Sequence, residues 1–269
     1  PTAATGGAAE AAASAAAAYE PPARWEAPQS GGKFAGINRP FAGARFEREL
    51  PKGTHALQLH SLGTPNGRKA TIMLEELIDA GKVADYDAFY IGIMQSDQFS
   101  SGFTAANPNQ KIPMLLDYAD GLDAAPTRVF ESGAVLLYLA DKYGAFVPAA
   151  GTAERTETLN WLFWQMGTAP YLGGILGHAY AYAPAEGKVK YWIDRGAMEA
   201  KRQLSVLDKE LANKAYIAGT DAPTIADFAI YPWIHQIYTG YKDVGTFLGV
   251  DEYKNVVAWQ ARLPARPPP

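Results

Sequence analysis

The segment Gly63-Thr64-Pro65-Asn66-Gly67 joins a short apolar stretch to one with helical periodicity. A helix N-terminus offers free N–H groups and a partial positive charge, which favour an anion. Thr64 and Asn66 could donate to a thiolate, and lowering a thiol pKa of about 8.5 by about two units takes roughly 2.7 kcal/mol. An Asn-Gly turn with a helix cap is the alternative. A phosphate-binding loop is excluded, because Lys69 precedes Ala70 rather than Ser or Thr and the glycine spacing is one residue short.

Cysteine is absent from all 269 residues. A disulfide framework, a zinc-thiolate site and a cysteine nucleophile are therefore excluded, and sulfur chemistry needs a thiol brought by a ligand. The histidines are not spaced as a ligand pair on one helix turn, so no metal is expected: His55, His60, His178 and His235. The net charge of −4 without a basic run argues against nucleic acid or a membrane as partner.

Two further pairs of residues could hold parts of a peptide-like ligand. If the bond before Pro113 is cis, the backbone of Ile112 could pair with an extended ligand; a plain strand-entry proline is the alternative. Glu131 could accept from an ammonium while the helix that starts at Ser132, a good N-cap residue, takes a carboxylate. Ordinary capping beside a surface acid is the alternative here.

An aromatic run follows between residues 161 and 182. Its tryptophans are expected in the core, whereas His178, Tyr180 and Tyr182 could face a cleft. A hydrolase elbow of the Gly-x-Ser-x-Gly type does not occur.

Hydrophobic periodicity predicts the elements that position these residues. Strands are expected at Ala56–His60, Tyr86–Ile91, Met114–Asp117 and Thr127–Phe130, and helices at Arg68–Ala80 and from Ser132 to about Gly144, with a polar loop over Gly92–Asn109. A parallel pair with a helical crossover plus an antiparallel hairpin gives a four-stranded mixed sheet, the thioredoxin-like layout.

The rest of the chain is expected to be all-helical. Ala200, Leu204, Leu207 and Leu211 form one apolar stripe, Thr224 opens a capping box with Asp227, and Val256–Leu263 makes a last helix. We predict an Ala-rich disordered tail over 1–18, an extended arm over 19–53, a thioredoxin-like domain over 54–145 and an all-helical domain over 150–269. The arm has aromatic anchors at Tyr19, Trp25, Phe34, Phe41 and Phe46.

Taken together and in this order, several segments resemble glutathione transferases, within them the bacterial and fungal nu-class group related to the yeast prion-like transferases. These segments are 61–67, 97–103, 107–113, 129–133, 160–164 and the capping box at Thr224. The resemblance extends from about Tyr19 to Arg266. It implies the glutathione transferase fold, an α/β domain followed by an all-α domain.

The resemblance also implies a glutathione site. Thr64, Pro65 and Asn66 would lie near the sulfur, with Thr64 and Asn66 as catalytic residues in place of the Tyr, Ser or Cys of other classes. Gln98 would contact the glycine end, Lys111 a carboxylate, Ile112 with Pro113 the cysteinyl backbone, and Glu131 with Ser132 the γ-glutamyl group. Asn38 and Arg195 match positions for a second glutathione.

Three functions follow as expectations. The first is a glutathione-dependent disulfide-bond oxidoreductase that uses two bound thiols, with transferase and peroxidase side activity. The second is a transferase or thioether-cleaving enzyme for aromatic electrophiles, and the third a non-catalytic glutathione-binding module. One or two glutathiones per subunit, a cytoplasmic location and a homodimer through 132–141 and 161–171 are expected, without a metal.

Overall fold

The computed structural model describes residues 20–27, 34–37 and 39–265. The tail predicted over 1–18 therefore lies outside the described residues, as do Tyr19 and Asn38. The chain divides into two units, Pro1–Ser30 and Gly31–Pro269. Residues 20–27 of the first unit form neither helix nor strand. Every helix and strand of the described residues belongs to the second unit.

In the described part of the chain, four strands form one sheet with the order β2-β1-β3-β4. They are β1 (Leu57–Ser61), β2 (Asp87–Tyr90), β3 (Met114–Asp117) and β4 (Thr127–Phe130). β1 runs parallel to β2 and antiparallel to β3, which pairs antiparallel with β4. The predicted four-stranded mixed sheet is confirmed.

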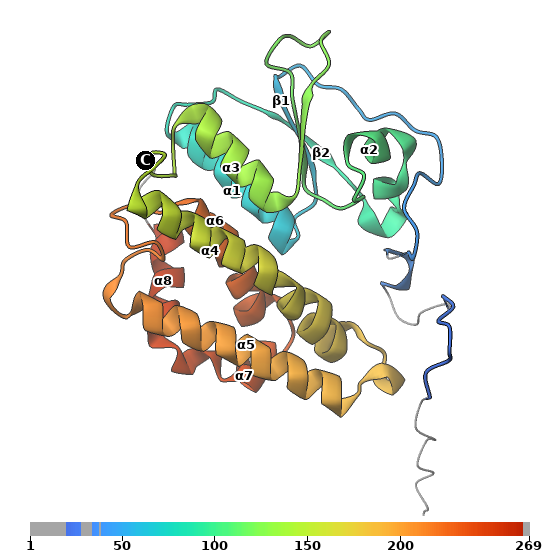
Figure 1. Cartoon of the computed structure of the whole chain (residues 1–269), viewed down its shortest axis with the longest axis vertical. Coiled ribbons are helices and arrows are strands. Elements are labelled where there is room, and N and C mark those ends of the chain that lie inside the picture. The colour runs from blue at the N-terminus through green and yellow to red at the C-terminus, as the bar shows by residue number, and fades with distance from the viewer. Residues whose placement is uncertain (1–19, 28–33, 38, 266–269) are drawn as a thin grey trace, which may run out of the picture. The chain divides into compact units, whose positions relative to one another are not determined.

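Helices cover both faces of this sheet (Figure 1). α1 (Pro65–Asp79) and α3 (Ser132–Tyr143) pack on the face that carries Leu57, Leu59 and Leu115. The opposite face carries Met114 and Leu116, which contact Phe103 of α2 (Ser101–Ala106). Because successive side chains of a strand point to opposite faces, β3 supplies apolar residues to both cores.

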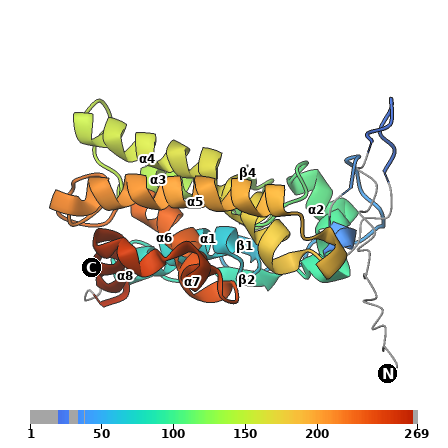
Figure 2. The ribbon, with the colours of Figure 1, turned by 90° about the horizontal axis from the view of Figure 1, so that it is seen from below.

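The remaining elements are helical, as Figure 2 shows from below. The longer ones are α4 (Ala153–Pro170), α5 (Lys190–Glu210), α6 (Ile225–His235), α7 (Val244–Leu248) and α8 (Lys254–Ala265). Two π-helical segments, η4 (Tyr171–Tyr182) and η7 (Gln236–Gly240), continue α4 and α6. Short 3-10 turns are η1 (Ala35–Ile37), η2 (Ile93–Gln95), η3 (Asp97–Phe99), η5 (Ala185–Gly187), η6 (Leu211–Asn213) and η8 (Val250–Glu252).

The stripe predicted on α5 is buried, and α6 begins with the predicted capping box of Thr224 and Asp227. Leu162 of α4 and Phe228 of α6 lie in the same apolar cluster as the sheet residues Leu57 and Leu115. The sheet and the helices therefore share a core, and the boundaries at 145 and 150 stay a prediction.

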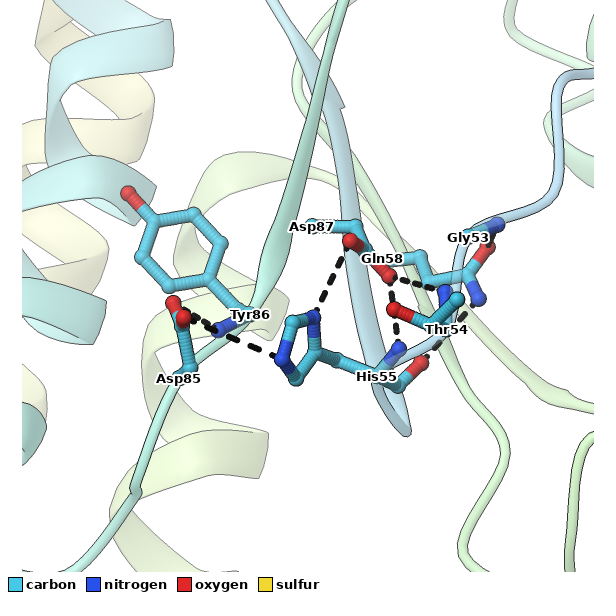
Figure 3. A network of polar contacts seen from close by, with 7 residues as sticks. All are labelled: Gly53, Thr54, His55, Gln58, Asp85, Tyr86 and Asp87. Atoms are coloured by element: carbon cyan, nitrogen blue, oxygen red, sulfur yellow. Dashed lines mark hydrogen bonds and ion pairs between the residues drawn. The ribbon is translucent and has the colours of Figure 1, made fainter.

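A polar cluster joins the starts of β1 and β2 (Figure 3). Asp87 Oδ2 accepts from the backbone N–H groups of Thr54 and His55, each at 2.7 Å, and Asp87 Oδ1 lies 3.0 Å from Nδ1 of His55. These hydrogen bonds lower the pKa of Asp87, and the Asp87 side chain in turn raises the pKa of His55. The cluster holds the register of the parallel pair, in which Gln58 lies opposite Asp87.

Residues 45–48 of the arm run alongside the segment that contains α2. Arg45 N–H donates to Phe99 O, and the N–H groups of Ser101 and Gly102 donate to Phe46 O and Arg48 O. The polar loop predicted over Gly92–Asn109 is therefore wrong in part, because it contains α2 and two 3-10 turns. Of the predicted anchors, Phe34 packs on Tyr182 at 4.3 Å, whereas Phe41 and Trp25 are exposed.

Candidate glutathione site

The strand register brings the predicted site segments to one end of the sheet. His60 lies opposite Met114, and Met114 lies opposite Phe130. The residues that follow β1, precede β3 and follow β4 therefore meet at the same end. β2 also ends there, because its last residue, Tyr90, pairs with Ser61.

Thr64 and Asn66 lie at the start of α1. Thr64 is the N-cap residue, and its Oγ1 accepts from Gly67 N–H at 3.2 Å. The cap bond uses one of the two lone pairs of this oxygen, so the hydroxyl hydrogen remains available to a ligand. Gly67 is needed at this turn because a Cβ there would overlap the carbonyl oxygen of Leu62. Pro65 occupies the first helical position, where a missing N–H breaks no helical bond.

The side chain of Asn66 is held by a residue of the helical half. Trp233 Nε1 of α6 donates a 2.8 Å hydrogen bond to Asn66 Oδ1 across 167 positions of sequence. Trp233 is 8% exposed, so this bond lies close to the core.

Glu131 and Ser132 form the start of α3. Glu131 is the N-cap residue with φ 74°, and Ser132 is the first helical residue, so the expected Ser132 cap is wrong by one position. The Glu131 side chain does not cap the helix but accepts from Asn109 Nδ2 at 2.7 Å. The first N–H groups of α3 therefore lack a side-chain cap, and a ligand carboxylate could bind them.

Lys69 of α1 lies fully buried beneath Ser132. Its Nζ donates to Ser132 Oγ at 3.3 Å and to Gln165 Oε1 of α4 at 2.5 Å. Burial lowers the pKa of this ammonium to about 7. Among the described residues, no carboxylate forms an ion pair with Lys69. A buried cation whose nearest interacting carboxylate is that of Glu131, without a direct ion pair, therefore lies behind the residue expected to hold the γ-glutamyl group.

The peptide bond between Ile112 and Pro113 is cis, as the strand-addition hypothesis requires. Ile112 precedes β3, whose pairing begins only at Met114, so no strand of the described residues pairs with Ile112. Lys111 is exposed, and its carbonyl accepts from Asn107 Nδ2 at 2.6 Å. Burial of part of the Lys111 side chain lowers the pKa of its ammonium.

Gln98 lies on η3, in the segment that follows β2. It is 3% exposed; its Nε2 donates to Ile93 O at 3.3 Å, while its buried Oε1 accepts no hydrogen bond from the described residues. The arm holds this turn in place, because Arg45 N–H bonds to Phe99 O and the Arg45 guanidinium covers the Phe99 ring at 3.4 Å.

The aromatic residues of η4 divide into two groups. His178 and Tyr182 meet Phe34 of the arm, with ring centroids 6.3 Å and 4.3 Å from that ring. Tyr180 instead stacks on Phe247 of α7 at 4.7 Å, so the structure does not bring all three predicted cleft residues together. Arg195 of α5 lies over the Tyr171 ring at 5.8 Å, at the start of η4.

Three site residues were not predicted from the sequence: Lys69, Asn109 and Trp233. Of these three, only Lys69 could have been identified from the sequence, because a lysine is unusual on the apolar face of a helix. The described residues contain no group of three or more His, Asp or Glu side chains that could hold a metal ion. Within the same ranges, no helix is long and apolar enough to cross a membrane.

The thioredoxin-like sheet, the helical half and this site define a class of protein. Residues 190–262 match the family model for the glutathione S-transferase C-terminal domain. The chain belongs to the glutathione transferase family of enzymes, which confirms the predicted family and fold class.

Within this family, the chain is similar to several named enzymes and solved structures. The chain is 53% identical over 252 residues to the disulfide-bond oxidoreductase YghU of Escherichia coli, covering 93% of this chain and 85% of that one. It is similar to the crystal structure of the glutathione transferase YghU from Streptococcus pneumoniae complexed with glutathione, with 54% identity, a TM-score of 0.87 and coverage of 93% and 95%. A Burkholderia graminis glutathione transferase with two glutathione molecules per subunit is 36% identical, with a TM-score of 0.70 and coverage of 78% and 84%.

Proposed function

We propose that this protein is a glutathione-dependent disulfide-bond oxidoreductase that uses two bound glutathione thiols. One observation carries the proposal: Thr64 and Asn66 lie at the N-terminus of α1, where both could donate to a ligand thiol, while the chain has no cysteine of its own. An enzyme thiol cannot take part in the exchange, so both reducing sulfurs must come from glutathione. The relatives solved with glutathione, one of them with two molecules per subunit, support this assignment.

The chemistry balances with two thiols. The first glutathione thiolate, stabilised by Thr64 and Asn66, attacks a sulfur of the substrate disulfide and forms a mixed disulfide while one substrate thiolate leaves. The second glutathione thiolate attacks the glutathione sulfur of that mixed disulfide and releases the other substrate thiolate. The two protons of the glutathione thiols end on the two released thiols, and the product of the pair is oxidised glutathione.

The other parts of the tripeptide would be held around the same sheet end. Glu131 accepts from the γ-glutamyl ammonium, and Ser132 with the free N–H groups of α3 binds the neighbouring carboxylate. Ile112, turned outward before Pro113, pairs with the cysteinyl backbone. Gln98 and Lys111 contact the glycine end and a carboxylate.

The second glutathione belongs on the helical side. Arg195 lies at the start of η4 and supplies a fixed positive charge for a glutathione carboxylate. Asn38 completes that site in this proposal and lies outside the described residues. We assign the chain to the nu-class group, because Thr64 and Asn66 stand where other classes have Tyr, Ser or Cys. The proposed enzyme is a homodimer in the cytoplasm, where the glutathione pool is kept reduced.

A specific observation favours transferase chemistry on aromatic electrophiles as a second activity. Phe34 of the arm and His178 and Tyr182 of η4 form an aromatic cluster, which could hold a flat ring by stacking. Peroxidase activity would use the same activated thiolate.

Variants at the start of α1 test the proposal. Asn66→Ala and Thr64→Ala should lower kcat for reduction of a small mixed disulfide by about 100-fold, because each loses a donor to the thiolate. Thr152→Ala is the matched control, since Thr152 caps α4 with a 3.2 Å bond from Arg155 N–H away from the site. It should lose about 1 kcal/mol of stability and keep its turnover. Calorimetry should give two glutathiones per subunit; one per subunit, with activity only toward aromatic electrophiles, would instead support the transferase.

A further inference from the structure

Trp233 and Asn66 form a hydrogen bond whose direction is set by chemistry. The indole Nε1–H can only donate, so the atom of the Asn66 amide that faces it must be the oxygen. The NH2 group of Asn66 therefore points away from Trp233. An asparagine without such a partner could rotate its amide and present either group.

The position of the Trp233 ring is fixed by the anchored start of α6 and by a close contact with η4. α6 begins with the capping box, and buried Asp227 of that box also accepts from Ile217 N–H at 3.0 Å and from Trp259 Nε1 at 2.9 Å. On its other side the ring meets Gly173 of η4, where a Cβ would overlap the six-membered ring of Trp233. The indole N–H thus comes from a fixed position.

The same helix start presents Thr64, whose oxygen is already used by the cap. With Trp233 in place, Asn66 has its NH2 group and Thr64 its hydroxyl hydrogen available, so each polar side chain of this turn can donate to a ligand. A thiolate accepts hydrogen bonds more strongly than a neutral thiol does. Two donors therefore favour the ionised form. A rotated Asn66 amide would aim its oxygen at the sulfur and favour the neutral thiol.

We infer that Trp233 is a positioning residue that holds the Asn66 NH2 group toward the thiol of bound glutathione and so raises the fraction of thiolate. This inference rests on the proposed function. Trp233 belongs to the helical half and is distant in sequence from Asn66, and it acts on the sulfur through Asn66 without touching the sulfur.

The test follows thiolate formation directly. The ultraviolet absorbance of the thiolate is titrated with pH on glutathione complexes of the wild type, Trp233→Phe, Asn66→Ala and the double variant. Trp233→Phe keeps an aromatic ring and removes the N–H group, and we expect the titration midpoint to rise by about one unit, a tenfold loss of thiolate. In the Asn66→Ala background the same change should add nothing, because its effect passes through Asn66.

Trp161→Phe is the matched control. Trp161 also donates through Nε1, to Glu157 Oε1 at 2.7 Å, and packs against the same helical core. Its loss should leave the midpoint unchanged.

Gly173→Ala is a second test variant, for the case in which Trp233→Phe does not fold. It displaces the Trp233 ring without removing the N–H group and should raise the midpoint as well.

The outcomes separate the inference from the proposed function. A wild-type midpoint in both Trp233→Phe and Gly173→Ala, with a raised one in Asn66→Ala, would overturn the role of Trp233 alone. A Trp233→Phe shift of full size in the Asn66→Ala background would do the same. A midpoint that does not respond to Asn66→Ala, or a protein that binds no glutathione, would overturn the proposed function and the inference with it.

Discussion

Lys69 donates a 2.5 Å hydrogen bond to Oε1 of Gln165, a residue 96 positions further along the chain. The same ammonium reaches Ser132 Oγ, so one buried cation joins α1, α3 and α4 directly behind the start of α3. Burying an ammonium without an anionic partner is costly. Glu131 acts on Lys69 without a direct ion pair, and a ligand carboxylate at Ser132 would add a second negative charge close to the ammonium.

The first prediction concerns this cation and is made for S-methylglutathione, whose blocked sulfur removes thiol ionisation. Burial lowers the pKa of Lys69 to about 7, and a bound carboxylate favours the protonated form. Affinity should therefore fall as pH rises through 7, by about tenfold between pH 6 and pH 8. Calorimetry at the two pH values measures this change.

Lys69→Met should bind about tenfold more weakly at pH 6 and lose the pH dependence. Lys190→Met, which changes an exposed lysine of α5, is the control and should behave as wild type. An unchanged pH dependence in Lys69→Met would show that Lys69 does not sense the ligand carboxylate.

A second prediction concerns Glu131, which has φ 74° in a region that side chains rarely adopt. Such a conformation costs about 1–3 kcal/mol and is retained where a function needs it. Glu131→Gly should raise the free energy of unfolding by about 1 kcal/mol and weaken glutathione binding at least tenfold. Urea unfolding and calorimetry measure the two effects.

Asp243→Gly provides the comparison for Glu131. Asp243 has φ 59° before α7, away from the sheet end, so its replacement should relieve backbone strain without changing glutathione affinity. If Glu131→Gly binds glutathione with wild-type affinity, the Glu131 side chain does not contribute to the binding site.

The positions of the strands can be predicted from the sequence in part because β3 is buried on both faces, whereas β2 shows the alternation of a half-exposed strand. Met114–Asp117 and Thr127–Phe130 have the predicted bounds, whereas α1 begins three residues before its predicted start. Thr64 and Pro65 explain that difference, since a cap and an N-terminal proline extend a helix into a segment without apolar periodicity.

The elements and contacts missed from the sequence depend on distant residues. α2 has six residues, and its Gly102 lies so close to the arm that a Cβ there would be 2.7 Å from Leu50 N. Trp233 and Lys69 reach the site through bonds that span 167 and 63 positions. Local periodicity contains no information about such pairs.

A third prediction concerns His60, which is fully buried in β1 against Phe89; within the described part of the chain, neither ring nitrogen has a hydrogen-bond partner. Burial lowers its pKa from the ordinary 6.5 to about 4. The unfolded chain therefore takes up a proton first as the pH falls below about 6.5, and stability is lost toward pH 4. From pH 8 to pH 5 this amounts to about 2 kcal/mol. In His60→Leu, urea unfolding should show that much less acid sensitivity; an equal loss in both proteins would place the sensitivity elsewhere.

A fourth prediction tests the proposed homodimer. Phe163 of α4 is 62% exposed within the segment 161–171 expected at the interface, and an exposed large apolar side chain is typical of such a surface. Phe163→Glu should yield monomers in sedimentation velocity. Met198→Glu changes an equally exposed residue of α5, 68% exposed, and should leave the dimer intact. Dimers of unchanged stability in Phe163→Glu would place the interface elsewhere.

The most direct test of the two-thiol mechanism is a single turnover without free glutathione. The enzyme is loaded with glutathione, passed through a desalting column, mixed with an equal amount of a small symmetric disulfide and quenched in acid for mass spectrometry. Two bound thiols should give one oxidised glutathione and two substrate thiols per subunit, because the second glutathione resolves the mixed disulfide. A stable mixed disulfide of glutathione and substrate, with no oxidised glutathione, would show that only one thiol reacts and would contradict the proposed mechanism.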